Sequence, residues 1–190
     1  VGEYLPGWHP YEDYRQMYAS RKDLGGGVIL TQIHELEVAL WFFGMPEEVY
    51  TVGGRFGKLE MDVEDTADLL LKCRWEGESL PVSIHLDYLQ RPPVRTCTLI
   101  GEEGRILWDY HGRFLEVRRS GGGEVQRFLF DRFERNQMFL DEMSHFLACI
   151  QGQAQPPVDV EEATKSLAIA LAARRSLETG EVIKVGCVGS

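Results

Sequence analysis

A series of short segments between residues 48 and 130 carries the residue pattern of β-strands, with little chain between one segment and the next. They are rich in β-branched and aromatic residues and are bounded by turn-forming residues: EVYTVGGRF, TADLLLKCRW, LPVSIHLDYL, VRTCTLIG, GRILWDY, RFLEVRRS and EVQRFLF. Between the later segments, GEEG (101–104), YHGR (110–113) and SGGGE (120–124) are typical of hairpin turns. Strands joined by such tight turns run antiparallel, so a mainly antiparallel sheet is predicted.

One of these segments alternates regularly between apolar and polar residues. In PVSIHLDY the apolar side chains of Val82, Ile84, Leu86 and Tyr88 are expected on one face of the strand. Ser83, His85 and Asp87 are then expected on the other face, where His85 and Asp87 are close enough to form a polar pair. Such a pair would line a substrate cleft, lie in solvent or lie at a contact between subunits.

Helical periodicity flanks the strands on both sides. Apolar residues recur at three- and four-residue steps from Val28 to Phe43, and Gly44 followed by Met45-Pro46 predicts the end of this helix. A shorter helix is predicted before it, over about residues 11–19. Two later helices are predicted over about 135–150 and 160–179, the second ended by Gly180 and followed by a last strand, EVIKV.

This order of elements predicts an α+β fold: a mixed, mainly antiparallel open sheet with helices packed on one face. Residues 1–24 are interpreted as a lead-in segment and residues 25–190 as one α+β domain. A chain of 190 residues with 44% apolar residues is long enough for one domain with a core of its own.

Charge and cysteine spacing narrow the class of function. The net charge of −10 argues against a nucleic-acid partner, which requires clustered Lys and Arg. No apolar run reaches the ~18 residues of a membrane span, and the N-terminus lacks the features of a signal peptide. Cys73, Cys97, Cys149 and Cys187 are too widely spaced for a disulfide framework or zinc site, so free thiols and a cytoplasmic location are expected. No recognised metal-ligand spacing is present, and no metal is expected.

The stretch LGGGVILTQIHELEVALWFFG (24–44) sets three glycines directly before the first long helix. A dinucleotide fingerprint requires G-x-G-x-x-G immediately after a strand. Gly25 and Gly27 match its first two positions, but Leu30 stands at the third, and the polar SRKDL precedes them. The glycines are therefore interpreted as supplying backbone angles and close approach between segments, with a direct phosphate contact as the alternative.

Thr31, His34 and Glu37 follow one another at three-residue steps. On a continuous helix Thr31 and His34 would be neighbours on one face. A hydroxyl or carboxylate beside an imidazole fixes its tautomer and suits it to proton transfer. The alternative is a partly buried, hydrogen-bonded histidine without a catalytic role.

The same stretch resembles the segment that opens the C-terminal domain of the glucose–fructose oxidoreductase, inositol dehydrogenase and rhizopine-catabolism oxidoreductase (Gfo/Idh/MocA) family. RPPVRTCTLIGEEGRILWD resembles the strand, hairpin and following strand of that family, and residues 136–185 resemble its closing pattern of two helices and a final strand. The likeness spans about residues 13–185. Two positions depart from the family pattern: Thr31 stands where an aspartate precedes the histidine, and Glu37 replaces a second aspartate.

The resemblance implies that His34 is the catalytic, proton-transferring histidine. In this family an N-terminal Rossmann domain binds NAD or NADP and carries a Glu-Lys-Pro motif, whose lysine assists the proton transfer while hydride passes to or from the nicotinamide. The C-terminal domain supplies the histidine, most of the sugar- or polyol-binding surface and an oligomer interface through its open sheet. No Glu-Lys-Pro occurs in these 190 residues. The nucleotide-binding domain is therefore expected outside this chain, and the chain alone is expected to be inactive.

The resemblance also places the substrate beside the lead-in LPGWHPYEDYR. Trp8, Tyr11 and Arg15, together with Thr31, are the candidate substrate-binding residues, because aromatic faces and a guanidinium suit sugar hydroxyls or a carboxylate. The alternative is that the lead-in residues have a packing role. A function of another class is a stand-alone, non-catalytic module with the same fold that dimerises or binds a small polar ligand. The sequence leaves open the substrate, the choice between NAD and NADP, and the direction of reaction.

Overall fold

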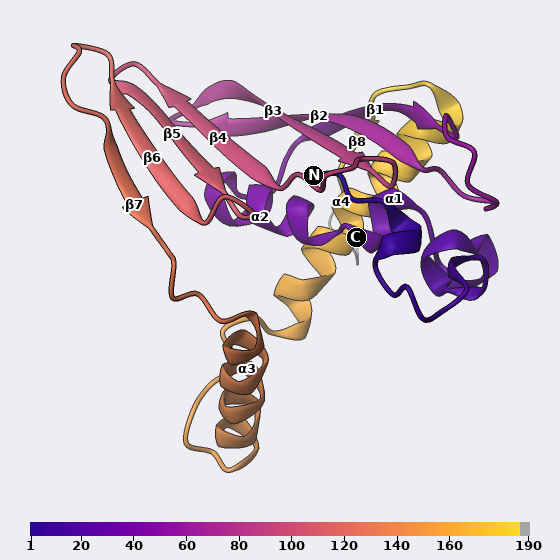
Figure 1. Ribbon diagram of the computed structural model, residues 1–190. Helices are drawn as coiled ribbons and strands as arrows, with labels where there is room; N and C mark the ends of the chain where they lie inside the picture. The colour runs from indigo at the N-terminus through magenta and orange to yellow at the C-terminus, as the bar shows by residue number, and fades with distance from the viewer. Residues whose placement is uncertain (187–190) are drawn as a thin grey trace. The chain divides into compact units, whose positions relative to one another are not determined.

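The computed structural model describes residues 1–186, and these divide into two compact units. Of the described residues, the first unit contains 1–94 and 160–186, and the second contains 95–159. The strands form two four-stranded sheets, ordered β3-β2-β1-β8 and β4-β5-β6-β7 (Figure 1). Every strand pairing in them is antiparallel, which confirms the α+β prediction. Pro92 and Pro93, which cannot donate ladder hydrogen bonds, lie between the last long strand of the first sheet and the first strand of the second.

The sheet of the first unit buries one face and exposes the other. It consists of β1 (Glu48–Gly54), β2 (Thr66–Trp75), β3 (Glu78–Asp87) and β8 (Ile183–Lys184). The inward side chains of β1 and β2 belong to the core: Val49, Ala67, Leu69, Leu71 and Cys73. The side chains between them point outward and are exposed: Tyr50, Val52 and Leu70. This alternation is the one that a half-buried sheet requires.

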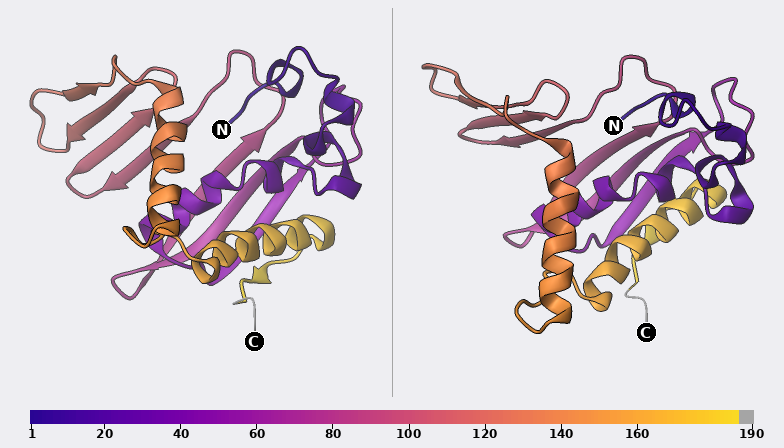
Figure 2. Two further views of the ribbon diagram at one scale, coloured as in Figure 1. Left: turned by 90° about the horizontal axis from the view of Figure 1, so that it is seen from below. Right: turned by 60° about the horizontal axis from the view of Figure 1, so that its bottom comes forward.

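Helices α1 (Val28–Thr31), α2 (His34–Phe43) and α4 (Val160–Thr179) lie over one face of this sheet (Figure 2). Buried residues of α2 and α4, among them Leu36 and Ile169, join the core of the sheet. On α4 the buried Ser176 hydroxyl accepts a hydrogen bond from the Thr51 N–H at 2.9 Å and donates one to the Glu181 carbonyl at 2.6 Å. Helix α4 has the bounds that its sequence predicts.

The helix expected over residues 11–19 is wrong. The lead-in instead forms short 3₁₀ turns at Leu5–Gly7, Tyr14–Gln16, Tyr18–Ser20 and Lys22–Leu24. Asp13 has an extended backbone, and its side chain accepts a hydrogen bond from the Arg15 N–H at 3.1 Å. Met17 is extended as well, with φ −68° and ψ 149°, so each turn closes before a helix is established.

The continuous helix expected from Val28 to Phe43 is also wrong, because the structure divides it into α1 and α2. Gln32 leaves the helical region with φ −98° and ψ 32°, and α2 begins two residues later at His34. The predicted end at Gly44 is confirmed. Its φ of 71° favours glycine, and its N–H donates to the Leu40 carbonyl at 2.8 Å.

The second unit contains β4 (Thr96–Gly101), β5 (Gly104–Asp109), β6 (Phe114–Arg119), β7 (Gln126–Leu129) and α3 (Arg135–Ile150). Hairpins join the strands at the predicted turns, and α3 has its predicted bounds. The register aligns an apolar row across one sheet face: Cys97, Trp108, Leu115 and Phe128. Across residues 1–186, no helix is both long enough and apolar enough to cross a membrane.

Candidate active site around His34

The N–H groups of the three glycines before α1 all donate hydrogen bonds to backbone carbonyl groups of the preceding residues. Gly25 donates to the Lys22 carbonyl at 3.2 Å, Gly26 to the Arg21 carbonyl at 2.9 Å, and Gly27 to the Ala19 carbonyl at 3.0 Å. A phosphate cradle requires such groups to point at the ligand. This turn therefore does not fit the pyrophosphate of a dinucleotide. This agrees with the interpretation that the glycines supply backbone angles and close approach between segments.

Glu64 fills the space that the last of these glycines leaves. A Cβ on Gly27, whose φ is 105°, would lie 2.3 Å from Oε1 of Glu64. The same Oε1 accepts a hydrogen bond from the Ile29 N–H at 3.2 Å, and the Glu64 carbonyl accepts one from the Val28 N–H at 3.1 Å. Burial raises the pKa of Glu64 above its ordinary value, since it outweighs the stabilising hydrogen bonds. The first two N–H groups of α1 are thus satisfied by one residue.

The other end of α1 lies against the end of β3. The side-chain amide of Gln32 donates to the Asp87 carbonyl at 3.3 Å. Tyr88 is fully buried and interacts with Thr31, and its ring meets that of Trp8 edge-on at 5.5 Å between centroids. Burial raises the pKa of Tyr88 far above its ordinary value, so its hydroxyl keeps its proton. Within residues 1–186, the Thr31 and Tyr88 hydroxyls and the Trp8 Nε1 are buried without a hydrogen bond of normal geometry.

The antiparallel register brings together the residues that hold the two ends of α1, Glu64 at its start and Asp87 at its end. Thr66 at the start of β2 pairs with Asp87 at the end of β3, and the Tyr88 N–H donates to the Asp65 carbonyl at 2.8 Å. Residues 64–65 and 87–88 therefore form one sheet corner. This sheet corner holds α1 at both ends, immediately before His34.

His34 begins α2 with 73% of its side chain exposed. Its Nδ1 lies 3.4 Å from Oε2 of Glu37, one turn further along the helix. A carboxylate on this side favours the tautomer with its proton on Nδ1, which leaves the Nε2 lone pair available to a substrate. Thr31 lies on α1, before the interruption, with its hydroxyl buried. The expectation that Thr31 and His34 are neighbours on one continuous helix is therefore not met.

The lead-in candidates occupy three different surroundings. Trp8 packs on Tyr88 and so lies near Thr31. Tyr11 is 79% exposed, and its hydroxyl lies 2.9 Å from Nδ1 of His9. Arg15 makes two hydrogen bonds to Asp13, at 2.8 and 2.9 Å.

Arg15 also lies 3.6 Å from Glu60, a residue that the sequence did not single out. The hydrogen bond from Arg15 lowers the pKa of Asp13 below its usual range. The guanidinium thus already has carboxylate partners. Among the described residues, no hydrogen bond, ion pair or ring contact joins Tyr11 or Arg15 to His34.

The polar pair expected on β3 is present. His85 Nε2 lies 3.0 Å from Oδ2 of Asp87, on the sheet face away from the helices. Asp68 of β2 completes the group, with Oδ1 at 2.9 Å from His85 Nδ1. Asp68 was not predicted from the sequence, because its proximity to His85 depends on the register of β2 against β3.

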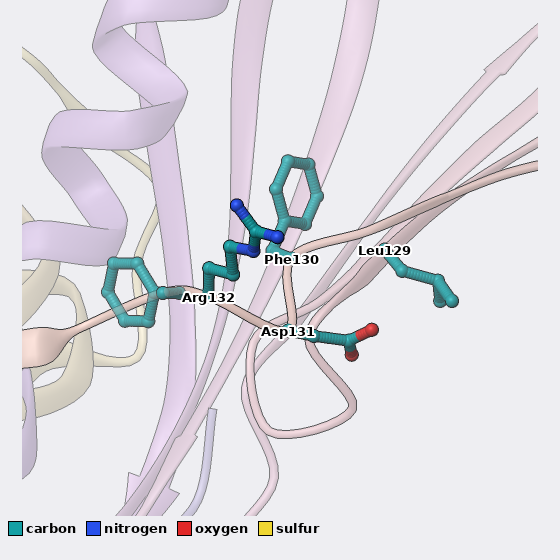
Figure 3. A pocket seen from close by; sticks show the side chains of 5 residues that line it. Leu129, Phe130, Asp131 and Arg132 are labelled. Atoms are coloured by element: carbon teal, nitrogen blue, oxygen red, sulfur yellow. The ribbon is translucent and has the colours of Figure 1, made fainter.

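A pocket of about 450 Å³ lies in the second unit, and its lining comes from one stretch of chain, Leu129–Phe133 (Figure 3). It contains none of the residues singled out from the sequence. In the part of the chain that the structure describes, no group of three or more His, Cys, Asp or Glu side chains is arranged to hold a metal ion.

Comparison with known proteins identifies the family to which the chain belongs. A family model described as "Oxidoreductase family, C-terminal alpha/beta domain" matches residues 8–185. The chain therefore matches the C-terminal α/β domain that this family model describes. It belongs to the Gfo/Idh/MocA family, as the resemblance of its sequence predicts. A search of curated protein sequences finds no match.

Solved structures share the fold at low sequence identity. A putative oxidoreductase from Thermotoga maritima is 21% identical with a TM-score of 0.73, over 97% of this chain and 53% of that one. A levoglucosan dehydrogenase in complex with NADH and levoglucosan is 13% identical with a TM-score of 0.79, over 98% and 57%. The WlbA dehydrogenase from Bordetella pertussis, in complex with NADH and UDP-GlcNAcA, is 21% identical with a TM-score of 0.69, over 98% and 52%. The chain thus spans about half the length of these proteins.

Proposed function

We propose that this chain is the substrate-binding and catalytic part of an NAD(P)-dependent oxidoreductase that acts on a hydroxyl of a sugar, sugar derivative or cyclitol. The observation that carries the proposal is His34, exposed at the start of α2 with its Nδ1 directed to Glu37. Membership of the oxidoreductase family supports it, as do the solved relatives whose complexes contain NADH with levoglucosan or UDP-GlcNAcA.

In this proposal His34 handles the proton of the reacting hydroxyl. Its Nε2 accepts the proton when the substrate is oxidised and returns it in the reverse direction, while Glu37 holds the ring orientation through Nδ1. Trp8 and Tyr11 offer aromatic faces to a sugar ring. Arg15, oriented by Asp13, binds substrate oxygen atoms, whereas Thr31, whose hydroxyl is buried, has a packing role beside Tyr88.

The cofactor, NAD or NADP, is proposed to be bound mainly by an N-terminal domain outside this chain. The glycine turn supports this assignment, since its N–H groups already have backbone partners. On its own the chain is proposed to be inactive. Calorimetry checks the first statement and a turnover assay the second, because the 190-residue chain should show neither tight NAD(H) binding nor nicotinamide turnover.

Oligomerisation and cellular location are also part of the proposed function. The outward face of the first sheet, with Tyr50, Val52 and Leu70 exposed, is proposed to form a homo-oligomer. The thiols of Cys73 and Cys149 are free, which supports a reducing compartment, and the cytoplasm is the proposed location.

The decisive test is His34→Ala in the full-length protein, assayed with NAD and NADP against a panel of aldoses, cyclitols and sugar nucleotides. Removal of a general acid–base group lowers kcat by roughly 10²–10⁴-fold, and the variant should remain folded. His111→Ala is the matched control, because His111 is an exposed histidine of the second unit. Unchanged kcat in His34→Ala would remove this residue from the mechanism, and a wild type without turnover on the whole panel would contradict the proposed function.

A further inference from the structure

Helix α1 is too short to hold its own position. It has four residues, and an isolated helix of this length is unstable because the cost of nucleation exceeds the gain from so few hydrogen bonds. It lies between the glycine turn and His34, so whatever fixes α1 also fixes the start of α2. Its placement must therefore come from contacts with other parts of the fold.

Glu64 supplies the contacts at the N-terminal end. Its carbonyl and its carboxylate accept hydrogen bonds from the consecutive N–H groups of Val28 and Ile29, at 3.1 and 3.2 Å. The carboxylate reaches this position because Gly27 has no Cβ, which would otherwise lie 2.3 Å from Oε1. Both the length of the glutamate and the absence of a side chain on Gly27 are thus required.

Backbone hydrogen bonds continue from this anchor toward His34. The Gln32 N–H donates to the Val28 carbonyl at 3.0 Å, and the Glu35 N–H donates to the Gln32 carbonyl at 3.1 Å. A displacement of the first turn of α1 is therefore transmitted to the first turn of α2. The second anchor, the hydrogen bond from Gln32 to the Asp87 carbonyl, lies on the same sheet corner.

The charged groups around Glu64 come from α4. Arg174 favours the ionised carboxylate and Glu178 opposes it. Glu178 lies 4.0 Å from Arg174 and is 64% exposed, and it makes no hydrogen bond to α1 among those described. It is therefore a matched carboxylate that shares the electrostatic surroundings of Glu64 without its contacts to α1.

We propose that Glu64 is a positioning residue for His34, acting through the hydrogen bond from the Ile29 N–H to its carboxylate rather than through its charge. The proposal rests on the proposed function, in which His34 transfers the substrate proton. In this proposal Glu64, which lies outside α2, determines the position of the His34 imidazole relative to the substrate.

Two substitutions in the full-length protein distinguish the effect of the length of the Glu64 side chain from the effect of its charge. Glu64→Gln keeps the length and an acceptor oxygen, and its kcat should stay within about twofold of the wild type. Glu64→Asp keeps the charge, but its shorter side chain withdraws the carboxylate oxygen from the Ile29 N–H. Because the catalytic His34 is then misplaced, kcat should fall about 10- to 100-fold with KM little changed. Glu178→Gln should match the wild type. Normal kcat in Glu64→Asp, or a large loss in Glu64→Gln, would overturn the proposal.

Chemical rescue provides a test that loss of stability does not imitate. Glu64→Ala leaves space for a small carboxylate next to the Ile29 N–H, so added formate should restore a measurable part of kcat, whereas chloride at equal ionic strength should not. If the folded Glu64→Ala protein is impaired and formate restores nothing, Glu64 does not act through this hydrogen bond. Should Glu64→Ala fail to fold, the Gln and Asp variants decide the question.

The ring signals of His34 in ¹⁵N NMR spectra of the same variants do not depend on turnover. They should move in Glu64→Asp and keep their wild-type positions in Glu64→Gln and Glu178→Gln. Unmoved signals in Glu64→Asp overturn the positioning role even if the enzyme is active. If instead His34→Ala leaves kcat intact while the Glu64→Asp signals move, the proposed function fails and the structural link stands.

Discussion

Nε2 of His85 lies 3.0 Å from Oδ2 of Asp87, while Nδ1 of the same ring lies 2.9 Å from Oδ1 of Asp68. A neutral imidazole carries one N–H, so His85 donates both hydrogen bonds only when it is protonated. Its two partners differ in burial, since the Asp87 side chain is 5% exposed and that of Asp68 is 67% exposed. Asp87 is also fixed by the N–H groups of Leu89 and Gln90, at 2.7 and 2.8 Å.

The first prediction concerns Asp87 and acid stability. Burial acts to raise the pKa of Asp87, but the hydrogen bonds from Leu89, Gln90 and His85 outweigh it, so the pKa lies below its ordinary value. A carboxyl with a lowered pKa in the folded state adds stability above its unfolded pKa of about 3.9, and this is lost as the pH falls through the folded value. Asp87→Asn should lower the free energy of unfolding by about 1–3 kcal/mol at pH 7.

Urea denaturation of both proteins from pH 7 down to pH 3 measures this difference. The gap between wild type and Asp87→Asn should narrow as the pH falls below the unfolded pKa of about 3.9, because the unfolded wild-type chain then binds a proton that the folded carboxyl binds only at lower pH. A gap of constant size across this range would show that the ionised form of Asp87 contributes nothing to stability.

The elements that local sequence determines were predictable. The bounds of β2, α3 and α4 agree with the sequence prediction, because alternation and helical periodicity are properties of the segments themselves. The division of the helix after Thr31 was not predictable. Gln32 leaves the helical conformation where its side chain binds the Asp87 carbonyl, 55 residues further along the chain.

The candidate site shows the same division between local and long-range information. The sequence itself lacks the third glycine of the fingerprint. His34 was singled out from its spacing to Thr31 and Glu37 and from the family resemblance, and its catalytic role stays a prediction. Glu64 and Asp68 were missed because they reach Ile29 and His85 through the placement of β2 in the fold. No local pattern encodes such pairs, and a single sequence offers no other signal for them.

The second prediction tests why a glycine precedes α1. Gly27→Ala combines a φ of 105° with a Cβ placed 2.3 Å from the Glu64 carboxylate, so the free energy of unfolding should fall by about 1–3 kcal/mol. Gly121→Ala is the control, since a Cβ there meets open space and no unusual φ is involved. Thermal denaturation of the two variants compares them directly, and equal melting temperatures would contradict a steric requirement at Gly27.

The third prediction uses the raised pKa of Glu64, and its sign is opposite to that of Asp87. Burial raises the pKa of Glu64 in the folded state, so its contribution is fully present below the unfolded value of about 4.3 and is lost as the pH rises through the folded value. Glu64→Gln avoids burying this charge and keeps an acceptor for Ile29. Its melting temperature should exceed that of the wild type at pH 8, with the difference shrinking toward pH 4. A Gln variant less stable at pH 8 than at pH 4, relative to wild type, would refute this assignment.

The last prediction concerns the outward face of the first sheet. Leu70 lies at the middle of β2 and is 48% exposed, and Leu70↔Ser83 and Tyr50↔Leu70 pairings place it between the neighbouring strands. If two copies associate through this face, Leu70→Arg places a charge in the contact and should reduce the molecular mass of the full-length protein measured by light scattering. Val182→Arg, a substitution at a residue that is 58% exposed outside the sheet, should leave the mass unchanged. An unaltered assembly in Leu70→Arg would place the interface elsewhere, because a buried unpaired arginine costs several kcal/mol in an apolar contact.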